Sequence, residues 1–387
     1  MVKRTLTVPS YEDSELTLQL SDTPELKTSW ARVPWERFGK LTEGSPEPYA
    51  VVREDPFKLY DFRNRGYLRF DRGFLDMKIM HGVIEDAQRS GVVFGTLNLS
   101  WEGEALLHPQ VEEILRWLGA AWRKQPFARR ILIPTSGTLL NHNFCKITAQ
   151  EFGDVPFTWV IVVDAFDKDS YLHTHEEQVW DRVLDNVNFL LHVMQESRPK
   201  ATRLILQHTV TPETAPHAAR FRDFWRAWLE QYGLPVREAA WRLPSGDGHW
   251  LFWKRTDPPD AAGLAVAKEA YGVALAALGL DATEGAPDEA ARKTCGAYWK
   301  TPTISWDGKV LLCTEDTQQT TKVGDANSGD LTAQWWEAPR LHQIRKQVMR
   351  EDYAGLNACR GCLKPYSPNA CSLRREETEA YFDMAGR

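Results

Sequence analysis

The amino-acid sequence alternates short apolar runs with longer stretches in which apolar residues recur at helical spacing. The run 92–99 predicts a buried strand, and the following segment 109–122 predicts an amphipathic helix. Further strands are predicted at 130–134, 157–163, 203–207 and 236–240, and further helices near 176–196 and 217–231. Because strands and helices follow one another in repeated βα units, the pattern predicts a parallel sheet covered by helices.

The N-terminal part is less regular but fits the same scheme. Residues 15–20 predict the first strand and residues 76–89 the first helix, separated by a long connector, 34–72, that is rich in Pro, Arg and aromatic residues. The chain thus holds about six βα units. Turn-forming Pro, Gly and Asp residues mark the stretch 244–292, which we interpret as a linker with an Ala-rich helix.

Cysteine is concentrated at the other end of the chain, where five of the six cysteines lie in the last quarter. Four of them, Cys295, Cys313, Cys359 and Cys362, follow the spacing C-x17-C-x45-C-x2-C. Four thiolates can ligate one metal centre completely, and an all-sulfur tetrahedral set selects an iron-sulfur cluster or zinc. Both chemistries use the C-x2-C pair, so the spacing alone leaves zinc open.

The residues between these cysteines carry a further pattern. Two short strands flank a turn at Asp307-Gly308, with Gly308 five residues before Cys313, and a Trp335-Trp336 pair precedes the last two ligands. This succession resembles the Twitch/SPASM extension of radical SAM enzymes. In that family the Twitch form, with four cysteines, holds one auxiliary 4Fe-4S cluster. Cys371, the remaining cysteine of this region, cannot build a second site alone.

The resemblance covers nearly the whole chain and implies an α/β fold. It consists of a partial (β/α)6 TIM-like barrel followed by a small cysteine-rich β-hairpin/α domain of the Twitch (SPASM-like) type. The implied division is an N-terminal tail at 1–12, a barrel at 13–243, a linker and helix at 244–292, an iron-sulfur domain at 293–375 and a C-terminal tail at 376–387.

One element of the family is missing from the barrel. Radical SAM enzymes carry a C-x3-C-x2-C loop after the first strand, and its three cysteines leave one iron open to S-adenosylmethionine. The matching positions here hold Leu26, Trp30 and Val33, which cannot bind iron. Cys145, the only cysteine before the C-terminal domain, has the apolar neighbours of a buried, inert thiol. The resemblance therefore implies a protein that lacks the cluster that cleaves S-adenosylmethionine.

Parts of the S-adenosylmethionine site are retained. By resemblance, Gly103 and Glu104 match the Gly-Gly-Glu-Pro turn after the second strand, Ser136 and Gly137 match the Thr-Asn-Gly segment after the third, and Asp164 matches the Ser-x-Asp-Ala segment after the fourth. These five residues are the expected cofactor-binding set. Simpler structural roles are also open, because an acidic residue such as Glu104 can cap a helix and Asp164 can form a turn.

His173 and His175 are followed by Glu176 and Glu177 and look like a metal-ligand cluster at first sight. The two histidines lie at strand spacing, and no third ligand has a defined place beside them. We therefore favour a solvated loop for this segment.

Composition and charge exclude several classes of partner. A net charge of −6 does not indicate the positively charged surface that binds nucleic acid. No apolar run approaches the length of a membrane span. The N-terminal residues Met1 to Arg4 are not followed by the apolar region of a secretory signal. We expect a cytoplasmic protein, in a compartment where thiolates stay reduced and available to a metal.

Two functions are compatible with these features. In the first, the chain is an iron-sulfur protein that serves as a partner, electron-relay or substrate-binding protein, acting with an active radical enzyme or on a peptide or small-molecule substrate. In the second, it is an enzyme that uses the barrel pocket, with or without bound S-adenosylmethionine, for non-radical chemistry. Candidate acid-base groups for that chemistry are Glu104, Asp164, His173 and His208, and the sequence singles out none of them as catalytic.

Overall fold

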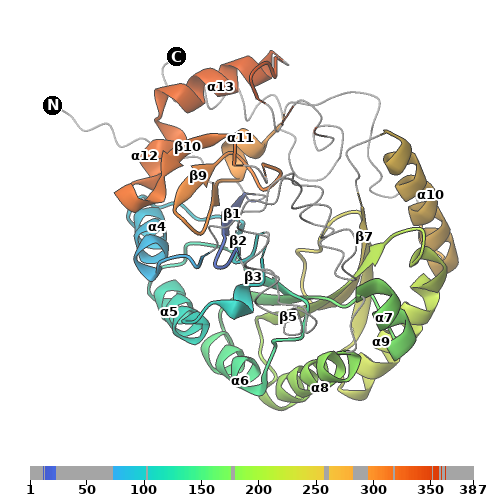
Figure 1. Ribbon diagram of the computed structural model, residues 1–387. Coiled ribbons are helices and arrows are strands. Elements are labelled where there is room, and N and C mark those ends of the chain that lie inside the picture. The colour runs from blue at the N-terminus through green and yellow to red at the C-terminus, as the bar shows by residue number, and fades with distance from the viewer. Residues whose placement is uncertain are drawn as a thin grey trace, which may run out of the picture.

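A single mostly parallel sheet forms the centre of the molecule, with helices along its outer face (Figure 1). The computed structural model describes residues 12, 14–22, 73–101, 103–175, 179–256, 261–281, 295–316, 319–350, 352–356, 359 and 362. The strand order is β10-β9-β8-β1-β2-β3-β4-β5-β7-β6. The sheet is strongly curved, so that the helices surround it as the outer layer of a partial barrel (Figure 1). The predicted α/β fold class is confirmed.

The barrel part alternates strands and helices as the apolar pattern predicts. Its strands are β1 (Glu15–Leu18), β2 (Thr96–Asn98), β3 (Ile131–Thr135), β4 (Phe157–Val162), β5 (Thr202–Val210), β6 (Val236–Ala240) and β7 (His249–Arg255). Its helices are α4 (Met77–Arg89), α5 (Val111–Lys124), α6 (His142–Glu151), α7 (Lys168–His175), α8 (Trp180–Ser197), α9 (Ala218–Gln231) and α10 (Ala261–Leu278). None of the helices in the described part of the chain combines the length and the apolar character that a membrane span needs.

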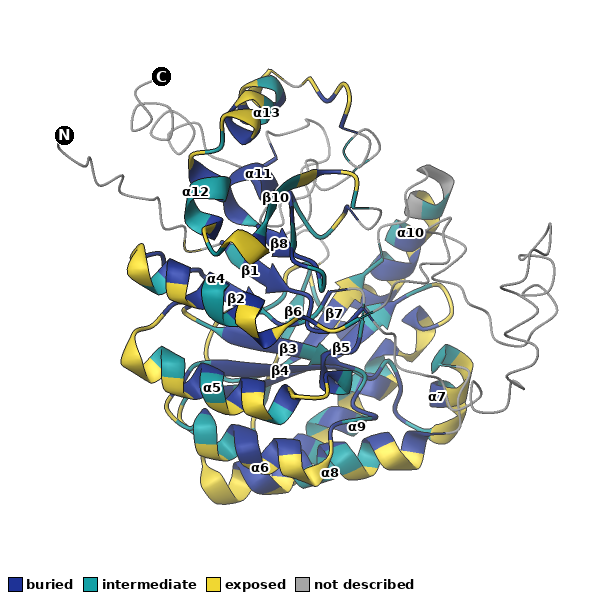
Figure 2. Cartoon of the chain, turned by 60° about the vertical axis from the view of Figure 1, so that its left-hand side comes forward, coloured by how far each residue is buried: buried dark blue, intermediate teal, exposed yellow. Residues whose placement is uncertain are grey.

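The two faces of the strands bury different apolar clusters. Alternate side chains of a strand point to opposite faces of the sheet. Leu132, Val160, Ile205 and Phe252 form one small buried cluster, whereas their neighbours along the same strands belong to the large core. Because the large core contains the buried faces of the outer helices, the small cluster fills the inner side of the barrel. Figure 2 shows the same division, with buried positions where helices face the sheet and exposed positions on their outer sides.

The prediction of a linker at 244–292 was wrong in its first part. Residues 249–255 form β7, which lies between β5 and β6 and is parallel to both. Its central residues Leu251, Phe252 and Trp253 are buried because they pack into the apolar clusters on the two faces of the sheet. The turn residues at 244–248 belong to the short connection from β6 to β7, and those at 257–260 lie outside the described residues. The Ala-rich helix is confirmed as α10.

The C-terminal segment continues the sheet of the barrel. It contains α11 (Ala297–Lys300), β8 (Thr303–Ile304), β9 (Lys309–Leu311), β10 (Lys322–Asp325), α12 (Leu331–Trp336) and α13 (Pro339–Met349). Strand β8 pairs in parallel with β1, with Thr17 opposite Thr303. The predicted turn at Asp307-Gly308 joins β8 to β9, and Gly308 has a φ of +83°, a conformation that favours glycine.

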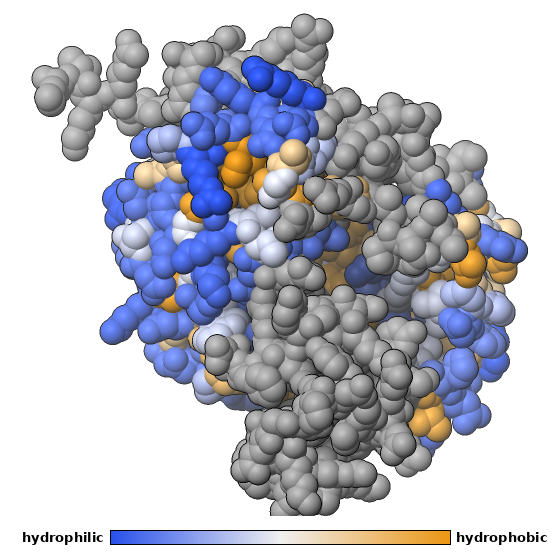
Figure 3. Space-filling model, turned by 45° about the horizontal axis from the view of Figure 1, so that its top comes forward, coloured by the Kyte–Doolittle hydropathy of each residue, from blue (hydrophilic) through white to orange (hydrophobic). Residues whose placement is uncertain are grey.

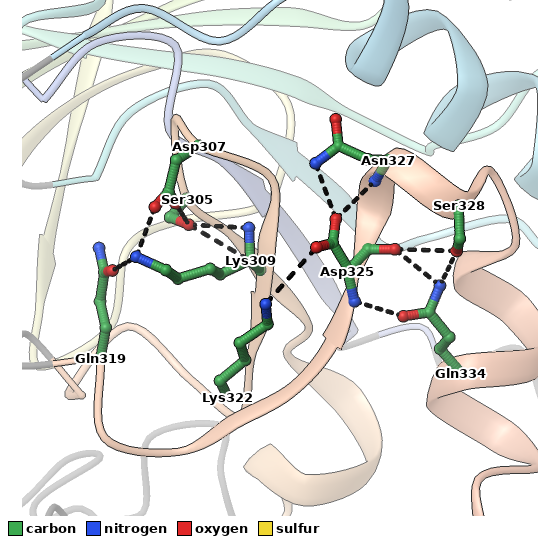
Figure 4. Close-up of polar contacts among 9 residues, drawn as sticks. All are labelled: Ser305, Asp307, Lys309, Gln319, Lys322, Asp325, Asn327, Ser328 and Gln334. Carbon is green, nitrogen blue, oxygen red and sulfur yellow. Dashed lines mark hydrogen bonds and ion pairs between the residues drawn. The ribbon is translucent and has the colours of Figure 1, made fainter.

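Polar side chains fix the loops around this hairpin (Figure 4). Lys309 pairs with the carboxylate of Asp307 and donates a hydrogen bond to Gln319 over 3.1 Å. The side chain of Asp325 accepts two hydrogen bonds from Asn327, while the backbone of Asp325 exchanges two with the Gln334 side chain. The strand β10 and the start of α12 are therefore held in a defined position next to the hairpin.

Candidate functional site

The four cysteines predicted as metal ligands line one common cavity. Cys295 lies two residues before α11, and Cys313 lies two residues after β9. Cys359 and Cys362 come after α13, from a part of the chain that is distant in sequence. Cys295 is buried and the other three are half-buried. The fold thus brings together, around one cavity, four cysteines that come from three separate segments of the sequence.

The loop after Cys313 is held by a single buried carboxylate. Asp316 accepts hydrogen bonds from the backbone nitrogen and hydroxyl of both Thr320 and Thr321, over 2.5 to 2.9 Å. Its side chain is 1% exposed and lines the cavity together with Leu312. Four donors satisfy the carboxylate in a site where an unpaired charge would be costly.

Tyr298 forms part of the cavity wall and contacts a cysteine directly. Its hydroxyl oxygen lies 2.7 Å from Sγ of Cys359. Burial raises the pKa of Tyr298 above its ordinary value, and the nearby sulfur of Cys359 raises it further. Tyr298 therefore keeps its proton, and the cavity presents a neutral hydroxyl to one of the four sulfurs.

The arrangement of donors suits an iron-sulfur cluster. A cluster is bound through irons at separate corners, so its cysteines surround a larger volume than the ligands of one zinc ion. Four cysteines around a shared cavity, with Leu312 and two tyrosines in its wall, match that requirement.

Hydrogen bonds attach this cavity to the ends of the first two barrel strands. The indole nitrogen of Trp101 donates to the carbonyl oxygen of Thr314 over 2.8 Å, one residue beyond Cys313. The side chain of Gln19 donates to the carbonyl oxygen of Trp101 and accepts from the backbone nitrogen of Trp306. The C-terminal segment is thereby fixed over the loop that carries Gly103 and Glu104.

Glu104, Ser136 and Gly137 lie together, as the resemblance implies. One carboxylate oxygen of Glu104 accepts from the backbone of Leu106 and caps a short 3-10 turn, Ala105–Leu107, so the capping role is confirmed. The other accepts from the Thr135 hydroxyl at 3.1 Å and from the Ser136 backbone at 3.2 Å. The second of these oxygens thus joins the loop after β2 to the end of β3. A role in cofactor binding stays a prediction for these residues and for Gly103, whose carbonyl oxygen accepts from the Ser100 hydroxyl.

Asp164 lines a separate polar pocket, which we call the barrel-end pocket. This cavity of about 300 Å³ lies at the carboxyl ends of β4 and β5, next to α7 and α9. Its lining includes Asp164, Asp167, His173, His208, Glu213 and Arg220. The structure therefore divides the predicted cofactor-binding set, with Asp164 in this pocket and Glu104 beside β3.

The conformation and environment of Asp164 are unusual. Its backbone φ is +52°, a conformation that residues other than glycine rarely adopt. Its carboxylate accepts a hydrogen bond from the backbone nitrogen of Thr209 at the end of β5. Burial raises the pKa of Asp164, although His175 and the Thr209 contacts favour the charged form. The hydrogen bond from Thr209 joins the end of β4 to the end of β5. Asp164 therefore makes a contact between strands, in addition to any role in its own turn.

The interpretation of residues 172–177 as a solvated loop was wrong for the described part. His173 and His175 belong to α7, where residues two apart point in different directions. The ring nitrogen Nε2 of His175 lies 2.9 Å from the carbonyl oxygen of Val163, while His173 faces the barrel-end pocket. The helix forms because Ser170 and Asp167 cap its start, a signal that the sequence contains.

Two other predictions concern Cys145 and the positions of the missing cluster ligands. Cys145 is 1% exposed on α6, and burial raises the pKa of its thiol to about 12, as expected of an inert cysteine. Leu26, Trp30 and Val33 lie outside the described residues, as does Cys371.

Comparison with known families identifies the cysteine-rich segment. Residues 295–363 match the sequence model of SPASM, described as an iron-sulfur cluster-binding domain. The C-terminal segment is a SPASM domain. No curated protein matches the sequence.

Solved structures give the fold of the whole chain. A structure titled native anSMEcpe with bound AdoMet and Cp18Cys peptide is 11% identical, with 96% of each chain covered and a TM-score of 0.52. Native anSMEcpe with bound AdoMet and Kp18Cys peptide is 12% identical, again with 96% of each chain covered, and has a TM-score of 0.51. At this identity the likeness concerns the fold. The chain therefore has the architecture of radical SAM proteins with a SPASM domain.

Sequence reasoning missed several residues of the SPASM domain. Tyr298 follows Cys295 by three positions, which places it on the adjoining short helix and near the same ligand site. Asp316 follows Cys313 at the same interval, and a Thr-Thr pair comes four residues later. The distance to Cys359 and the burial of Asp316 depend on tertiary contacts, so the sequence indicates only their proximity to cysteines.

The barrel-end pocket makes a prediction about pH. Burial lowers the pKa of His208 from 6.5 to about 4, against a smaller opposing effect from the backbone of Thr214. Between these values the unfolded chain binds a proton that the native protein does not, so the contribution to stability is complete above pH 6.5 and is lost as the pH falls to about 4. We expect His208→Phe to remove up to about 3 kcal/mol of this pH dependence in urea unfolding.

The exposed Leu172 on α7 provides the control, because Leu172→Phe introduces the same aromatic side chain without removing a titratable group. Identical slopes of unfolding free energy against pH in wild type and His208→Phe would contradict the assignment.

Proposed function

We propose that this protein binds one auxiliary 4Fe-4S cluster of the Twitch type on Cys295, Cys313, Cys359 and Cys362, and that it does not cleave S-adenosylmethionine reductively. It would act as an electron-relay, substrate-binding or partner protein. The observation that carries the proposal is the common cavity lined by all four cysteines. The SPASM match supports an iron-sulfur centre at this place.

The barrel supports the second half of the proposal. Reductive cleavage requires an iron that S-adenosylmethionine itself chelates, and three cysteines after the first strand normally hold it. Strand β1 ends at Leu18, and the sequence between it and α4 contains no cysteine. Cys145, which is buried on α6 with a raised thiol pKa, cannot replace them.

The SPASM domain is well placed for a relay or binding role. A cluster held by four cysteines supplies one-electron transfer without an open coordination site. The chain itself positions that centre, since Trp101 and Gln19 hold the loop beside Cys313 against the barrel end. Figure 3, in which the top of Figure 1 comes forward, shows apolar side chains among mostly hydrophilic ones on the described part of that face. We infer that a peptide or partner segment bound at the SPASM domain would lie close to the cluster.

The first test is the stoichiometry of the cluster. Protein reconstituted anaerobically should hold about four irons and four sulfides per chain, because one four-cysteine set is available. Cys313→Ala and Cys359→Ala should abolish the charge-transfer absorption, whereas Cys145→Ala should retain it. Eight irons per chain, or stoichiometric zinc after anaerobic preparation, would refute the proposed centre.

The second test is the reaction with S-adenosylmethionine. Reduced, fully reconstituted protein should form no 5′-deoxyadenosine above the uncatalysed background, as measured by chromatography after anaerobic incubation. Cys295→Ala serves as the control for background reduction by the reagent. Multiple turnovers by wild type, absent in that variant, would show that the chain cleaves the cofactor after all.

The barrel-end pocket supports a second candidate function, an enzyme with non-radical chemistry. The pocket combines acidic groups, a neutral buried imidazole at His208 and the cation of Arg220. These groups could move protons at a bound ligand, and Asp164 is the position at which the family resemblance places S-adenosylmethionine contacts. The structural neighbours contain bound AdoMet, which supports testing this ligand first.

We expect S-adenosylmethionine to bind, and Asp164→Ala to weaken binding about tenfold through loss of a hydrogen-bonding group. Isothermal titration of the oxidised protein measures both dissociation constants. The control is Asp154→Ala, an exposed carboxylate that pairs with Arg123. Equal affinity in all three proteins would place any ligand site away from Asp164.

A further inference from the structure

One side chain of the SPASM domain contacts a cysteine sulfur without being a predicted ligand. Tyr298 is 1% exposed, and its hydroxyl lies 2.7 Å from Sγ of Cys359. Tyr298 and Cys359 both line the cavity that Cys295, Cys313 and Cys362 complete. A thiolate bound to iron has no proton to give, so the phenolic O–H must be the donor in this contact.

The short helix that carries Tyr298 is held at two successive carbonyl groups. Nε of Arg345 donates to the carbonyl oxygen of Tyr298 over 2.8 Å. The indole nitrogen of Trp335 donates to the next carbonyl oxygen, that of Trp299, over 3.0 Å. These bonds reach α11 from α12 and α13, so they fix the backbone from which the Tyr298 ring projects.

Arg345 is itself fixed by its surroundings. It is 0% exposed, and Nη2 donates to the carbonyl oxygen of Trp335 over 2.7 Å. Its guanidinium carbon lies 5.4 to 5.7 Å from the ring centres of Trp299, Trp335 and Trp336. A planar cation enclosed by three indoles has little freedom to rotate. The phenol of Tyr298 is therefore aimed at Cys359 by a rigid support.

We propose that the Tyr298 hydroxyl donates a hydrogen bond to the Cys359 thiolate and raises the reduction potential of the cluster, with Arg345 as the positioning residue. This inference rests on the proposed four-cysteine cluster. One-electron reduction adds a negative charge to the cluster and its thiolates. A hydrogen bond to a thiolate is stronger when the sulfur carries more charge, so it stabilises the reduced state more than the oxidised state.

The critical variant is Tyr298→Phe, which keeps the ring and removes the hydroxyl. The midpoint potential, measured by redox titration with EPR detection, should become more negative while the iron content stays at about four per chain. Electron-nuclear double resonance after exchange into deuterium oxide should show the loss of one exchangeable proton near the cluster. A change in protein stability alone would not alter that proton signal.

Tyr353→Phe is the matched control, because Tyr353 lines the same cavity. It removes a hydroxyl from the wall and should leave the midpoint potential and the exchangeable-proton signal at their wild-type values. Arg345→Lys keeps the positive charge but loses the planar group, and should shift the potential in the same direction as Tyr298→Phe, by a smaller amount.

Several outcomes would overturn the inference. An unchanged potential in Tyr298→Phe with four irons bound would show that the hydroxyl does not tune the cluster. Equal shifts in Tyr298→Phe and Tyr353→Phe would assign the effect to general polarity of the cavity wall. Loss of iron from Tyr298→Phe alone would make the hydroxyl a support for cluster retention. Wild-type protein without iron would refute the four-cysteine cluster, and the inference with it.

Discussion

The pairing of β8 with β1 determines where the cysteine cavity lies relative to the barrel. The backbone nitrogen of Thr17 donates to Pro302 over 3.0 Å, and that of Gln19 donates to Ile304 over 2.9 Å. Without this pairing β1 would have an unpaired edge, which proteins generally cover. Because Cys295 and Cys313 flank the hairpin that β8 begins, the same hydrogen bonds that complete the barrel sheet also place two of the four sulfur ligands.

Buried polar groups make this junction specific. The backbone groups at a sheet edge can pair with many different strands, so they do not select one partner. The Gln19 side chain adds specificity, because it forms three hydrogen bonds, with Asp22, Trp101 and the turn after β8. A shift of β8 by one residue along β1 would break the contact with Trp306 and turn the side chains of β8 to the opposite face. Unpaired polar groups in a buried site cost about 1 to 3 kcal/mol each. One register is therefore strongly preferred, and with it one position of the SPASM domain.

The sequence predicts those features that local pattern determines. Helices with an apolar face, the Asp307-Gly308 turn and the set of four cysteines all follow from spacing within short segments, and the structure contains the helices and the turn as expected. Strand β7 was missed because its neighbours in the sheet, β5 and β6, decide that its residues are buried, whereas its own flanking residues resemble a linker. Helix α7 was missed because two histidines two residues apart suggested a strand period, although Asp167 caps the start of a helix there. The Tyr298 and Cys359 contact spans 61 residues and depends on α12 and α13, so no local pattern could reveal it.

The two sites of this molecule differ in the chemistry that their surroundings allow. The cysteine cavity is walled by tyrosines and apolar groups, and its buried carboxylate, Asp316, already accepts four hydrogen bonds. Such an environment suits electron transfer, in which charge changes and no proton needs to move. The barrel-end pocket instead presents Asp164 with a raised pKa and His208 with a lowered one, a pairing that suits proton transfer.

The loop from Trp101 to Glu104 connects the cysteine cavity to the barrel, since Trp101 bonds to Thr314 and Glu104 to the end of β3. A ligand held beside this loop would thus be linked to the cysteine cavity through hydrogen bonds of the chain itself.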